Sequence, residues 1–573
     1  MESITSQTIL SPNSSVSTAS PRNFNSDSPP RNITTTTTDP YEEDAVLLRY
    51  ELDVPHDSEV EDLGKYVKGG YHPVEIGDYL GDDDRFRVVH KLGFGGYGTV
   101  WLCHDKFSKK WRAVKIMQAK VSTLDCADLK ALETTFAGLD ANVLAANHIQ
   151  LALEYFYING PNGRHLCFVL PFLGPDLTEI FGVYGHVTWL MKDICFQLVE
   201  AMRFIHSLNL CHGDFRTANI LLRLADGVDE WEEEAIMGML GEPEFVPVRR
   251  IDDGHGAEHE PGVPDYLVEP AYVSYGSGAC STEIAVIDFG VSYCAAKPPT
   301  DQGTGIPLES AAPEELFKLY DSLGFHTDIW ALGVAIARVR FGFPAVANKR
   351  DCLVEAVQKL ESTMGPMPNP YRTVWKSWNG KFANCQNGPR EALEDDGWKD
   401  ESVFATVNTK RHEELQRQRL LEGRPAHFLQ YRMHHPNRMF IGEQDAKRIA
   451  ARAAANPRVL PGNDCAAEDG DEDDEDEADY MLDETESAQL YDLLMRIFKW
   501  HPEQRATLDQ IANHEWFGER NRRWQLGASP APSASARDNR AKRKGWDRLA
   551  GAIGRMVAEV IDILDRNKMG REE

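Results

Sequence analysis

Residues 93–98 carry four glycines in the run Gly-Phe-Gly-Gly-Tyr-Gly, between two stretches that alternate apolar and polar residues. Alternation of this kind predicts β-strands on either side of a tight turn. Glycines have no side chain, so backbone N–H groups in such a turn can approach phosphates closely. A dinucleotide-binding fold would need a helix directly after the glycines, whereas residues 100–105 predict a strand. The chain therefore contains a glycine-rich hairpin, for which phosphate binding and a purely structural turn are both open interpretations.

Lys115 ends the next alternating run, Ala113-Val114-Lys115, fifteen residues beyond Val100. A lone lysine in this position is usually the exposed end of a strand. After a glycine-rich hairpin, its cation also fits the role of holding the α- and β-phosphates of a nucleotide.

Three polar positions farther along suit metal-assisted phosphoryl transfer. Asp214 and Asn219 lie five residues apart, directly after an apolar helical pattern. The carboxylate could accept the proton of an attacking hydroxyl while the amide oxygen holds a metal ion. Asp288 follows a buried-type strand and begins an Asp-Phe-Gly tripeptide, and its carboxylate would bind Mg²⁺ that bridges the β- and γ-phosphates. That tripeptide is common by chance, but its order after the glycines, Lys115 and Asp214 is not.

Strand patterns in the first part of this region give way to helical periodicity at residues 189–207 and 326–342, which predicts an α+β protein. We expect a small β-rich N-lobe and a larger helical C-lobe, with two polar, acidic insertions or long loops in the latter. The expected bounds are 85–173 for the N-lobe, 174–517 for the C-lobe, and 224–282 and 345–487 for the insertions.

Both ends of the chain read as tails. Residues 1–60 form a Ser/Thr-rich stretch that we expect to be disordered, because it holds too little apolar surface to offset its ordering entropy. Residues 518–573 form a C-terminal tail in which apolar residues three and four apart predict an amphipathic helix at about 545–566. Packing on its own domain is the first interpretation of that helix, and a partner or membrane surface is the alternative.

The net charge of −29 disfavours non-specific nucleic-acid binding and favours basic partners. Part of that charge is local, since residues 464–479 hold eleven acidic residues and no basic one. The ten cysteines are scattered without zinc-site spacing, and neither a signal peptide nor an apolar run of membrane-spanning length is found. We expect a monomer located in the cytoplasm, the nucleus or both, with no transmembrane segment.

Over residues 85–517, the chain resembles the eukaryotic protein kinases. Ala312-Pro313-Glu314 resembles the motif that closes their activation segment, the run starting at Asp328 resembles their D-x-W-x-x-G helix, and 501–505 resembles their late H-P-x-x-R. The resemblance implies a bilobal kinase fold, ATP and Mg²⁺ as cofactors, Asp214 as catalytic base, Asn219 and Asp288 as metal ligands, and a structural ion pair between Glu314 and Arg505.

A narrower resemblance is to the serine/arginine-rich-protein kinases, or SR-protein kinases. It rests on GKYVKGGYHPVEIGDYL at residues 64–80, on the linker-like PNGRHLCFVLPFLGPDL, and on extra sequence before Asp288. It implies a serine/threonine kinase for basic, Arg/Ser-rich proteins, which would connect the chain to the regulation of mRNA splicing. It places Leu170 at the gatekeeper position. The implied ATP-binding residues are Leu92, Gly93, Phe94, Gly95, Gly96, Tyr97, Gly98, Val100, Ala113, Lys115, Pro171 and Leu173.

Three positions depart from the kinase pattern. Gly213 stands where many kinases have an Arg that receives a phosphorylated activation loop, so we expect a loop set in place without phosphorylation. Arg216 stands where Ser/Thr kinases carry a Lys, keeping the charge near the γ-phosphate with a different geometry. The partner of Lys115 is open between Asp128, which the SR-kinase alignment implies, and Glu133, which has typical kinase spacing.

Two other functions fit parts of the pattern. A pseudokinase scaffold is motivated by Gly213, Arg216 and the unsettled partner of Lys115. A small-molecule phosphotransferase of the aminoglycoside or choline kinase type is motivated by His212-Gly213-Asp214. Those enzymes would not be expected to combine the glycine loop with the motifs at 312–314 and 328–333.

Overall fold

The structure is a computed structural model. It describes residues 59–251, 260–271, 273–301, 303–343, 345–347, 351–378 and 482–518, short stretches at 7–8, 46–47, 49–53, 437–438 and 479–480, and residues 451 and 460. The chain divides into one compact unit, Met1–Ala512, and a second, Asn513–Glu573. The predicted helix at 545–566 lies outside the described residues.

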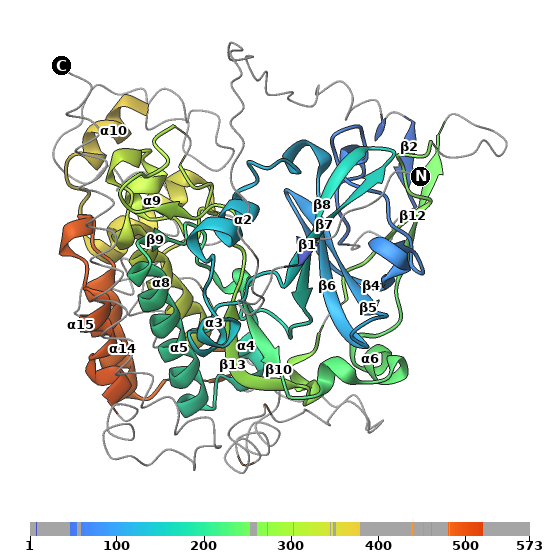
Figure 1. Ribbon diagram of the computed structural model, residues 1–573. Helices are drawn as coiled ribbons and strands as arrows, with labels where there is room; N and C mark the ends of the chain where they lie inside the picture. Colours follow the sequence, from blue (N-terminus) through green and yellow to red (C-terminus); the bar gives the residue numbers. More distant parts are fainter. Residues whose placement is uncertain are drawn as a thin grey trace, which may run out of the picture. The chain divides into compact units, whose positions relative to one another are not determined.

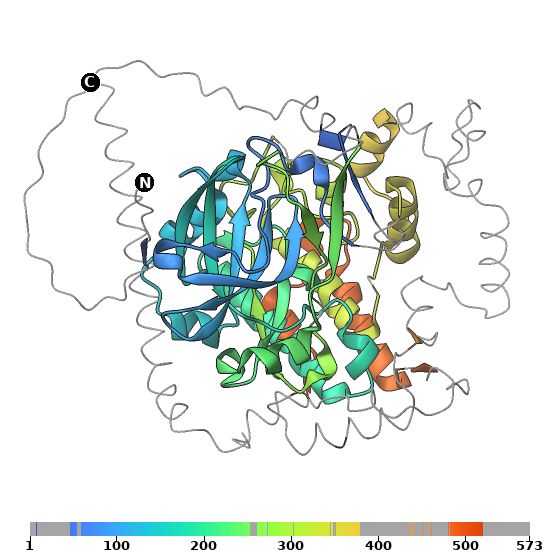
Figure 2. The ribbon, with the colours of Figure 1, turned by 90° about the vertical axis from the view of Figure 1, so that its right-hand side faces the viewer.

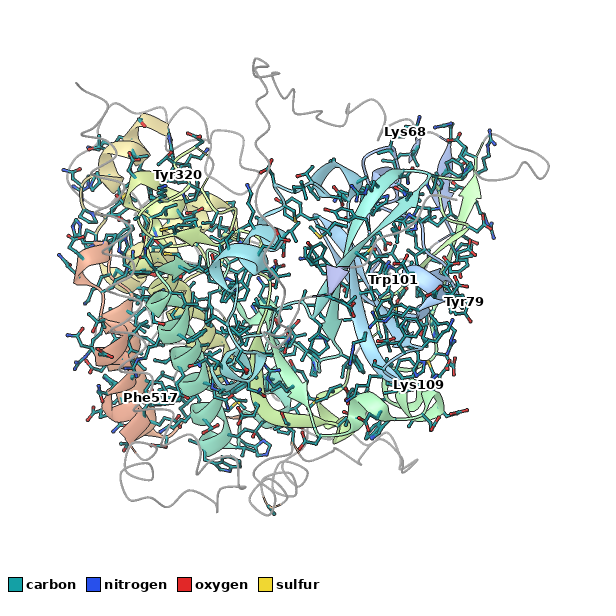
Figure 3. The ribbon with its side chains drawn as sticks, viewed as in Figure 1. Lys68, Tyr79, Trp101, Lys109, Tyr320 and Phe517 are labelled. Carbon is teal, nitrogen blue, oxygen red and sulfur yellow. The ribbon has the colours of Figure 1, made fainter. Side chains whose placement is uncertain are left out.

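An antiparallel sheet of seven strands forms the first half of the larger unit (Figure 1). Its core is the hairpin expected from the alternating pattern around the glycines. Trp101 lies buried within this sheet and Tyr79 lies exposed at its edge strand (Figure 3). The strand order is β1 (Gln7–Thr8), β7 (Glu154–Gly160), β8 (Gly163–Pro171), β6 (Lys110–Met117), β5 (Gly98–Asp105), β4 (Phe86–Gly95) and β3 (Tyr79–Leu80).

Helices form the other half of this unit, and Figure 2 shows them behind the sheet. Helix α8 (Phe325–Phe341) is buried on nearly every side, as a central helix must be, and contacts α4 (Ile180–Tyr184), α5 (Thr188–Ser207) and α14 (Glu484–Ile497). It ends at Gly342, whose φ of 78° suits a glycine at a helix C-terminus. The predicted α+β arrangement is confirmed.

The described residues form further helices and strands besides these. The remaining helices are α2 (Ala127–Lys130), which continues as a π-helical turn (Ala131–Thr135), α3 (Ala141–Ala146), α6 (Glu233–Leu240), α7 (Pro313–Leu316), α9 (Leu353–Met364), α10 (Tyr371–Trp378) and α15 (Leu508–Ala512). The remaining strands are β2 (Tyr50–Leu52), β9 (Leu210–Cys211), β10 (Ile220–Leu224), β11 (Phe245–Arg250), β12 (Tyr266–Val268), β13 (Cys280–Val286), β14 (Tyr293–Cys294), β15 (Asn437–Arg438) and β16 (Asp479–Tyr480).

Residues 224–282, which we expected to be an insertion or a long loop, contain α6, β11 and β12. Helix α6 packs its apolar side, Ile236 and Leu240, against Trp111 and neighbouring residues of the large sheet. Strand β11 pairs with β12 and also with β2. Two described strands lie within residues 1–60, where we expected a disordered tail: β1 pairs with β7, and β2 pairs with β11 and contains the buried Tyr50.

Two further expectations fall partly or wholly outside the described residues. The second insertion contains α9 and α10, while residues 381–436 and the acidic run at 464–478 are not described. Across the part of the chain that is described, no helix combines the length and apolar character needed to cross a membrane.

Candidate active site

The glycine-rich hairpin joins β4 to β5, with Gly95 opposite Gly98 and a two-residue turn between them. Gly98 packs against β6 so closely that a Cβ there would lie 2.3 Å from the carbonyl oxygen of Ile116. By contrast, a Cβ on Gly93, Gly95 or Gly96 would meet nothing within 4 Å. The fold itself requires only one of the four glycines, so the other three leave open backbone, which is what close approach of a phosphate needs.

Lys115 lies on β6 opposite Val100 of β5, beneath the hairpin. Its Nζ is 3.4 Å from Oδ1 of Asp128 and 3.5 Å from Oδ1 of Asp288. Burial alone would lower the pKa of this ammonium, but the two carboxylates outweigh burial and raise it. The lysine is therefore held as a cation between two acidic side chains from distant parts of the chain.

The structure brings Asp128, rather than Glu133, to Lys115. Glu133 instead accepts a hydrogen bond from the Tyr155 hydroxyl at 2.6 Å. Helix α2 is short and continues as a π-helical turn, which changes the angular position of Glu133 relative to Asp128. Asp128 also lies against Gly290, where a Cβ would come 2.7 Å from Oδ2 of Asp128. The Asp128 side chain, although shorter than that of a glutamate, thus reaches Lys115, because Gly290 at the third position of the Asp-Phe-Gly segment has no side chain.

Asp214 lies half-buried in the loop between β9 and β10. Arg216 Nε donates to both of its carboxylate oxygens, at 3.0 and 3.1 Å, and Asn219 Nδ2 donates to Oδ2 at 2.7 Å. Burial raises the pKa of Asp214 above its usual value, although Arg216, His212 and Asn219 act against that rise. A carboxylate held in place with a raised pKa is a candidate general base.

Asp288 and Asn219 lie beside each other, because the Ile287 backbone N–H donates to the Asn219 carbonyl at 2.9 Å. Asp288 has a φ of 64°, in the left-handed region that non-glycine residues adopt uncommonly. Lys115 lowers the pKa of Asp288 despite its burial, so the carboxylate stays charged. Charged and amide oxygens are donors that Mg²⁺ prefers, and the pair fits this ion. No cluster of three or more His, Cys, Asp or Glu suited to a metal occurs among the described residues.

The other expected nucleotide contacts lie on adjacent strands. Ala113 of β6 is opposite Leu170 of β8, the expected gatekeeper, and Pro171 ends that strand. Leu173 follows and is buried. Leu92 of β4 is half-buried against the apolar cluster that contains Trp111 and α6. Phe94 and Tyr97 are exposed at the hairpin.

Asp328 fixes the backbone that precedes Asp214. Its carboxylate accepts hydrogen bonds from the N–H groups of His212, at 2.7 Å, and Gly213, at 3.1 Å. Gly213 has a φ of 80°, and a Cβ there would lie 2.7 Å from the Val291 carbonyl oxygen. The glycine is therefore required by both the backbone angle and the close approach of the segment after Asp-Phe-Gly.

The segment before α7 is held by a carboxylate. Glu315 accepts hydrogen bonds from the N–H of Thr304, at 2.6 Å, and from its hydroxyl, at 3.1 Å. Burial raises the pKa of Glu315, with the Thr304 bonds acting in the opposite direction. In the sequence, only its place directly after the motif that ends at Glu314 marks Glu315.

Glu314 and Arg505 form a fully buried ion pair. Two hydrogen bonds run from the guanidinium to the two carboxylate oxygens, at 2.7 and 2.6 Å. Arg505 also donates to the carbonyl of His326 at 2.8 Å, and the Thr327 hydroxyl donates to Glu314 at 3.0 Å. The pair joins the start of α7 to the segment before α15.

Known proteins match this arrangement over part of the chain. The family model described as "Protein kinase domain" matches residues 86–229. Protein kinase dsk1 of Schizosaccharomyces pombe is 34% identical over 175 residues, 29% of this chain and 31% of that protein. SRSF protein kinase 3 of Homo sapiens is 34% identical over 191 residues, 31% and 33% of the two chains. Serine/threonine-protein kinase SKY1 of Saccharomyces cerevisiae is 33% identical over 174 residues, 29% and 23%.

The chain thus spans about a third or less of the length of these curated relatives. A solved kinase domain aligns with a TM-score of 0.42 at 18% identity, over 78% of this chain and 98% of that one. The expected bilobal protein kinase fold and the resemblance to SR-protein kinases are confirmed. Residues 86–229 thus match a protein kinase domain, and the similar proteins are named as protein kinases, one of them as an SRSF protein kinase.

Proposed function

We propose that this chain is an ATP- and Mg²⁺-dependent serine/threonine protein kinase that phosphorylates basic, Arg/Ser-rich proteins. The observation that carries the proposal is that the Asp128 and Asp288 carboxylates both lie within 3.5 Å of the Lys115 ammonium, beside an open glycine hairpin. Asp214 and Asn219 lie next to this group and are joined by a hydrogen bond. A scaffold would not need these charges to be kept together.

In the proposed mechanism, Lys115 binds the α- and β-phosphates and the hairpin N–H groups cover them. Asn219 and Asp288 would hold Mg²⁺, which neutralises phosphate charge when bound. Asp214 orients a serine or threonine hydroxyl and accepts its proton as the oxygen bonds to the γ-phosphorus and the bond to the leaving ADP oxygen breaks. Arg216 moves from Asp214 to the γ-phosphoryl oxygens and stabilises the negative charge spread over them.

We also propose that the activation segment is held without phosphorylation. The support is the Glu315 carboxylate on Thr304, together with Gly213 packed beneath Val291, where an Arg side chain could not be accommodated. Phosphatase-treated protein should keep full activity. A Glu315→Gln variant should lose activity, because the segment around Thr304 is then held less firmly. Loss of activity on phosphatase treatment alone would contradict this part of the proposal.

The proposed substrate class follows from charge. A chain with a net charge of −29 favours basic peptides, because guanidinium groups pair well with carboxylates. The names of the human and yeast relatives add support for a protein substrate, and the SRSF kinase name for an SR protein. We further propose that the protein acts in the cytoplasm, the nucleus or both, which imaging of a fluorescently tagged chain tests.

The decisive experiment incubates the protein and its Asp214→Asn variant with labelled ATP, Mg²⁺ and a peptide array at low salt. We expect label on Arg/Ser peptides with the unmodified protein and none with the variant. Equal labelling of acidic peptides would refute the substrate class, since charge complementarity is greatest at low ionic strength. Absence of label from both proteins would favour a scaffold, and label on aminoglycosides or choline would favour a small-molecule phosphotransferase.

A further inference from the structure

The Tyr71 side chain connects a segment before the sheet to the glycine-rich hairpin. Its hydroxyl donates a hydrogen bond to the carbonyl oxygen of Gly95 at 2.5 Å, and the side chain is 1% exposed. Burial and the nearby Glu61 carboxylate raise the pKa of Tyr71 to about 12, so the phenol keeps its proton at neutral pH. Gly95 is one of the three glycines that the fold leaves open, and this bond is a side-chain contact to its backbone.

Tyr71 is itself held firmly. Its N–H donates to the Lys65 carbonyl at 2.8 Å, and Nδ2 of Asn162, at the β7–β8 turn, donates to its carbonyl at 2.8 Å. The two preceding glycines make this turn possible, because Gly69 has a φ of 85° and a Cβ on Gly70 would lie 1.9 Å from the Lys65 carbonyl oxygen. The Gly-Gly-Tyr triplet is therefore a tight turn that delivers one hydroxyl to the hairpin.

The same segment holds the base of the hairpin through Glu61. Its carboxylate accepts a hydrogen bond from the Tyr66 hydroxyl at 2.6 Å and pairs with the buried ammonium of Lys91, on β4 two residues before Gly93. Burial lowers the pKa of Lys91 while Glu61 acts to raise it. Removing one member of a buried ion pair costs far more stability than removing one member of an exposed pair. The Glu61–Lys91 pair therefore fixes the base of the hairpin, and Tyr71 extends from the same segment to its tip.

The tip has few other restraints. Beyond the strand ladder, the N–H of Gln118 donates to the Tyr97 carbonyl at 2.8 Å. Phe94 and Tyr97 are exposed, although the Lys91 ammonium lies over the Phe94 ring at 5.4 Å, so their side chains contribute only modest packing there. Glycine loses more conformational freedom on ordering than any other residue, so an untethered hairpin would lose more entropy when it closes over a ligand.

We infer that Tyr71 is a positioning residue for nucleotide binding: its hydroxyl presets the backbone of the glycine-rich hairpin in the conformation that receives phosphates. The inference rests on the proposed function for its ligand, ATP with Mg²⁺, but the tether is a property of the protein alone. It assigns a physical role to the Gly-Gly-Tyr triplet at residues 69–71, which the phosphoryl-transfer site does not use.

The test compares full-length Tyr71→Phe with Tyr184→Phe. Each variant removes one buried phenolic hydroxyl that donates to a backbone carbonyl. In Tyr184 this hydroxyl donates to the Tyr275 carbonyl at 2.7 Å, away from the hairpin. The first measurement is amide hydrogen exchange of the peptide covering residues 92–100, without nucleotide. We expect about fivefold faster exchange in Tyr71→Phe, the factor that corresponds to one lost hydrogen bond, and no change in Tyr184→Phe.

The second measurement is steady-state kinetics with Mg²⁺, ATP and an Arg/Ser peptide. Tyr71→Phe should raise the KM for ATP about fivefold while the KM for the peptide stays the same. A merely destabilised protein would lower the active fraction and leave both KM values unchanged, as expected for Tyr184→Phe. Unchanged exchange at 92–100, or equal changes in both variants, would overturn the inference. If the unmodified protein transfers no phosphate, the proposed function fails, while the exchange comparison still decides whether the tether exists.

Discussion

Replacing Arg505 with methionine tests whether the buried ion pair organises the helical half. The guanidinium supplies both of the strongest bonds to Glu314, at 2.7 and 2.6 Å, and neither side chain is exposed. Without it, the carboxylate keeps only the Thr327 hydroxyl as a side-chain donor. Leaving a buried charge unpaired in this way costs about 3–5 kcal/mol, which corresponds to a fall in Tm of roughly 5 °C for a domain of this size.

Urea unfolding followed by tryptophan fluorescence measures this loss. Arg203→Met is the matched control, because Arg203 pairs with Asp509 at 2.8 Å but both side chains are largely exposed, so its removal should cost less than about 1 kcal/mol. A second variant, Arg505→Met with Glu314→Gln, removes the stranded charge and should recover part of the stability. The reasoning is refuted if Arg505→Met costs no more than the control, or if the double variant is as unstable as the single one.

The pH dependence gives the same prediction an independent check. Burial acts to raise the pKa of Glu314, but Arg505 outweighs it and holds the pKa below its usual value. In the unmodified protein, this carboxylate therefore stabilises the fold above the unfolded-state pKa, and that contribution is lost as the pH falls through the lowered folded pKa. Without Arg505, burial alone raises the folded pKa, so the destabilisation should be greatest at neutral pH and should shrink as the pH falls.

Three other outcomes follow. Asp128→Ala should lower kcat/KM for ATP about tenfold or more through misplacement of Lys115, whereas Glu133→Ala should leave it nearly unchanged; equal losses in steady-state assays would contradict the observed pairing. Because burial raises the pKa of Asp214, kcat/KM should fall with decreasing pH at a higher pH than a free aspartate would give, as a pH–rate profile can show. Ile236→Ala should cost about 2–4 kcal/mol in urea unfolding, since α6 packs this side chain into the core beside the large sheet, and a loss below 1 kcal/mol would show that the insertion is only loosely attached.

The long periodic helices could be predicted closely from the sequence. The patterns at 189–207 and 326–342 correspond to α5, Thr188–Ser207, and α8, Phe325–Phe341. Such agreement is expected where many apolar positions specify one helix face. The glycine-rich hairpin could be predicted equally well, because the glycines and the alternating strands around them are adjacent in the sequence.

The insertion at 224–282 could not be assigned in the same way. Strand β11 is six residues long and finds its partner β2 almost two hundred residues earlier. Local patterns carry little information about pairing over that distance, because the partner's side chains and exposure decide it. The choice between Asp128 and Glu133 was also beyond local reasoning, since it depends on where the helix after β6 changes from α to π geometry.

Gly213 shows how a departure from a family pattern acquires a physical reason only in three dimensions. From the sequence it is a missing arginine. In the structure the backbone there has a φ of 80° and lies against the Val291 carbonyl, so a side chain at this position would force the activation segment away from the catalytic loop. Thr304 lies over the same glycine and is bound by Glu315. The absent arginine, the close approach of Val291 and the Glu315 carboxylate are therefore parts of one arrangement in which packing and a fixed carboxylate hold this segment; under the proposed function, they replace a phosphate that would otherwise order it.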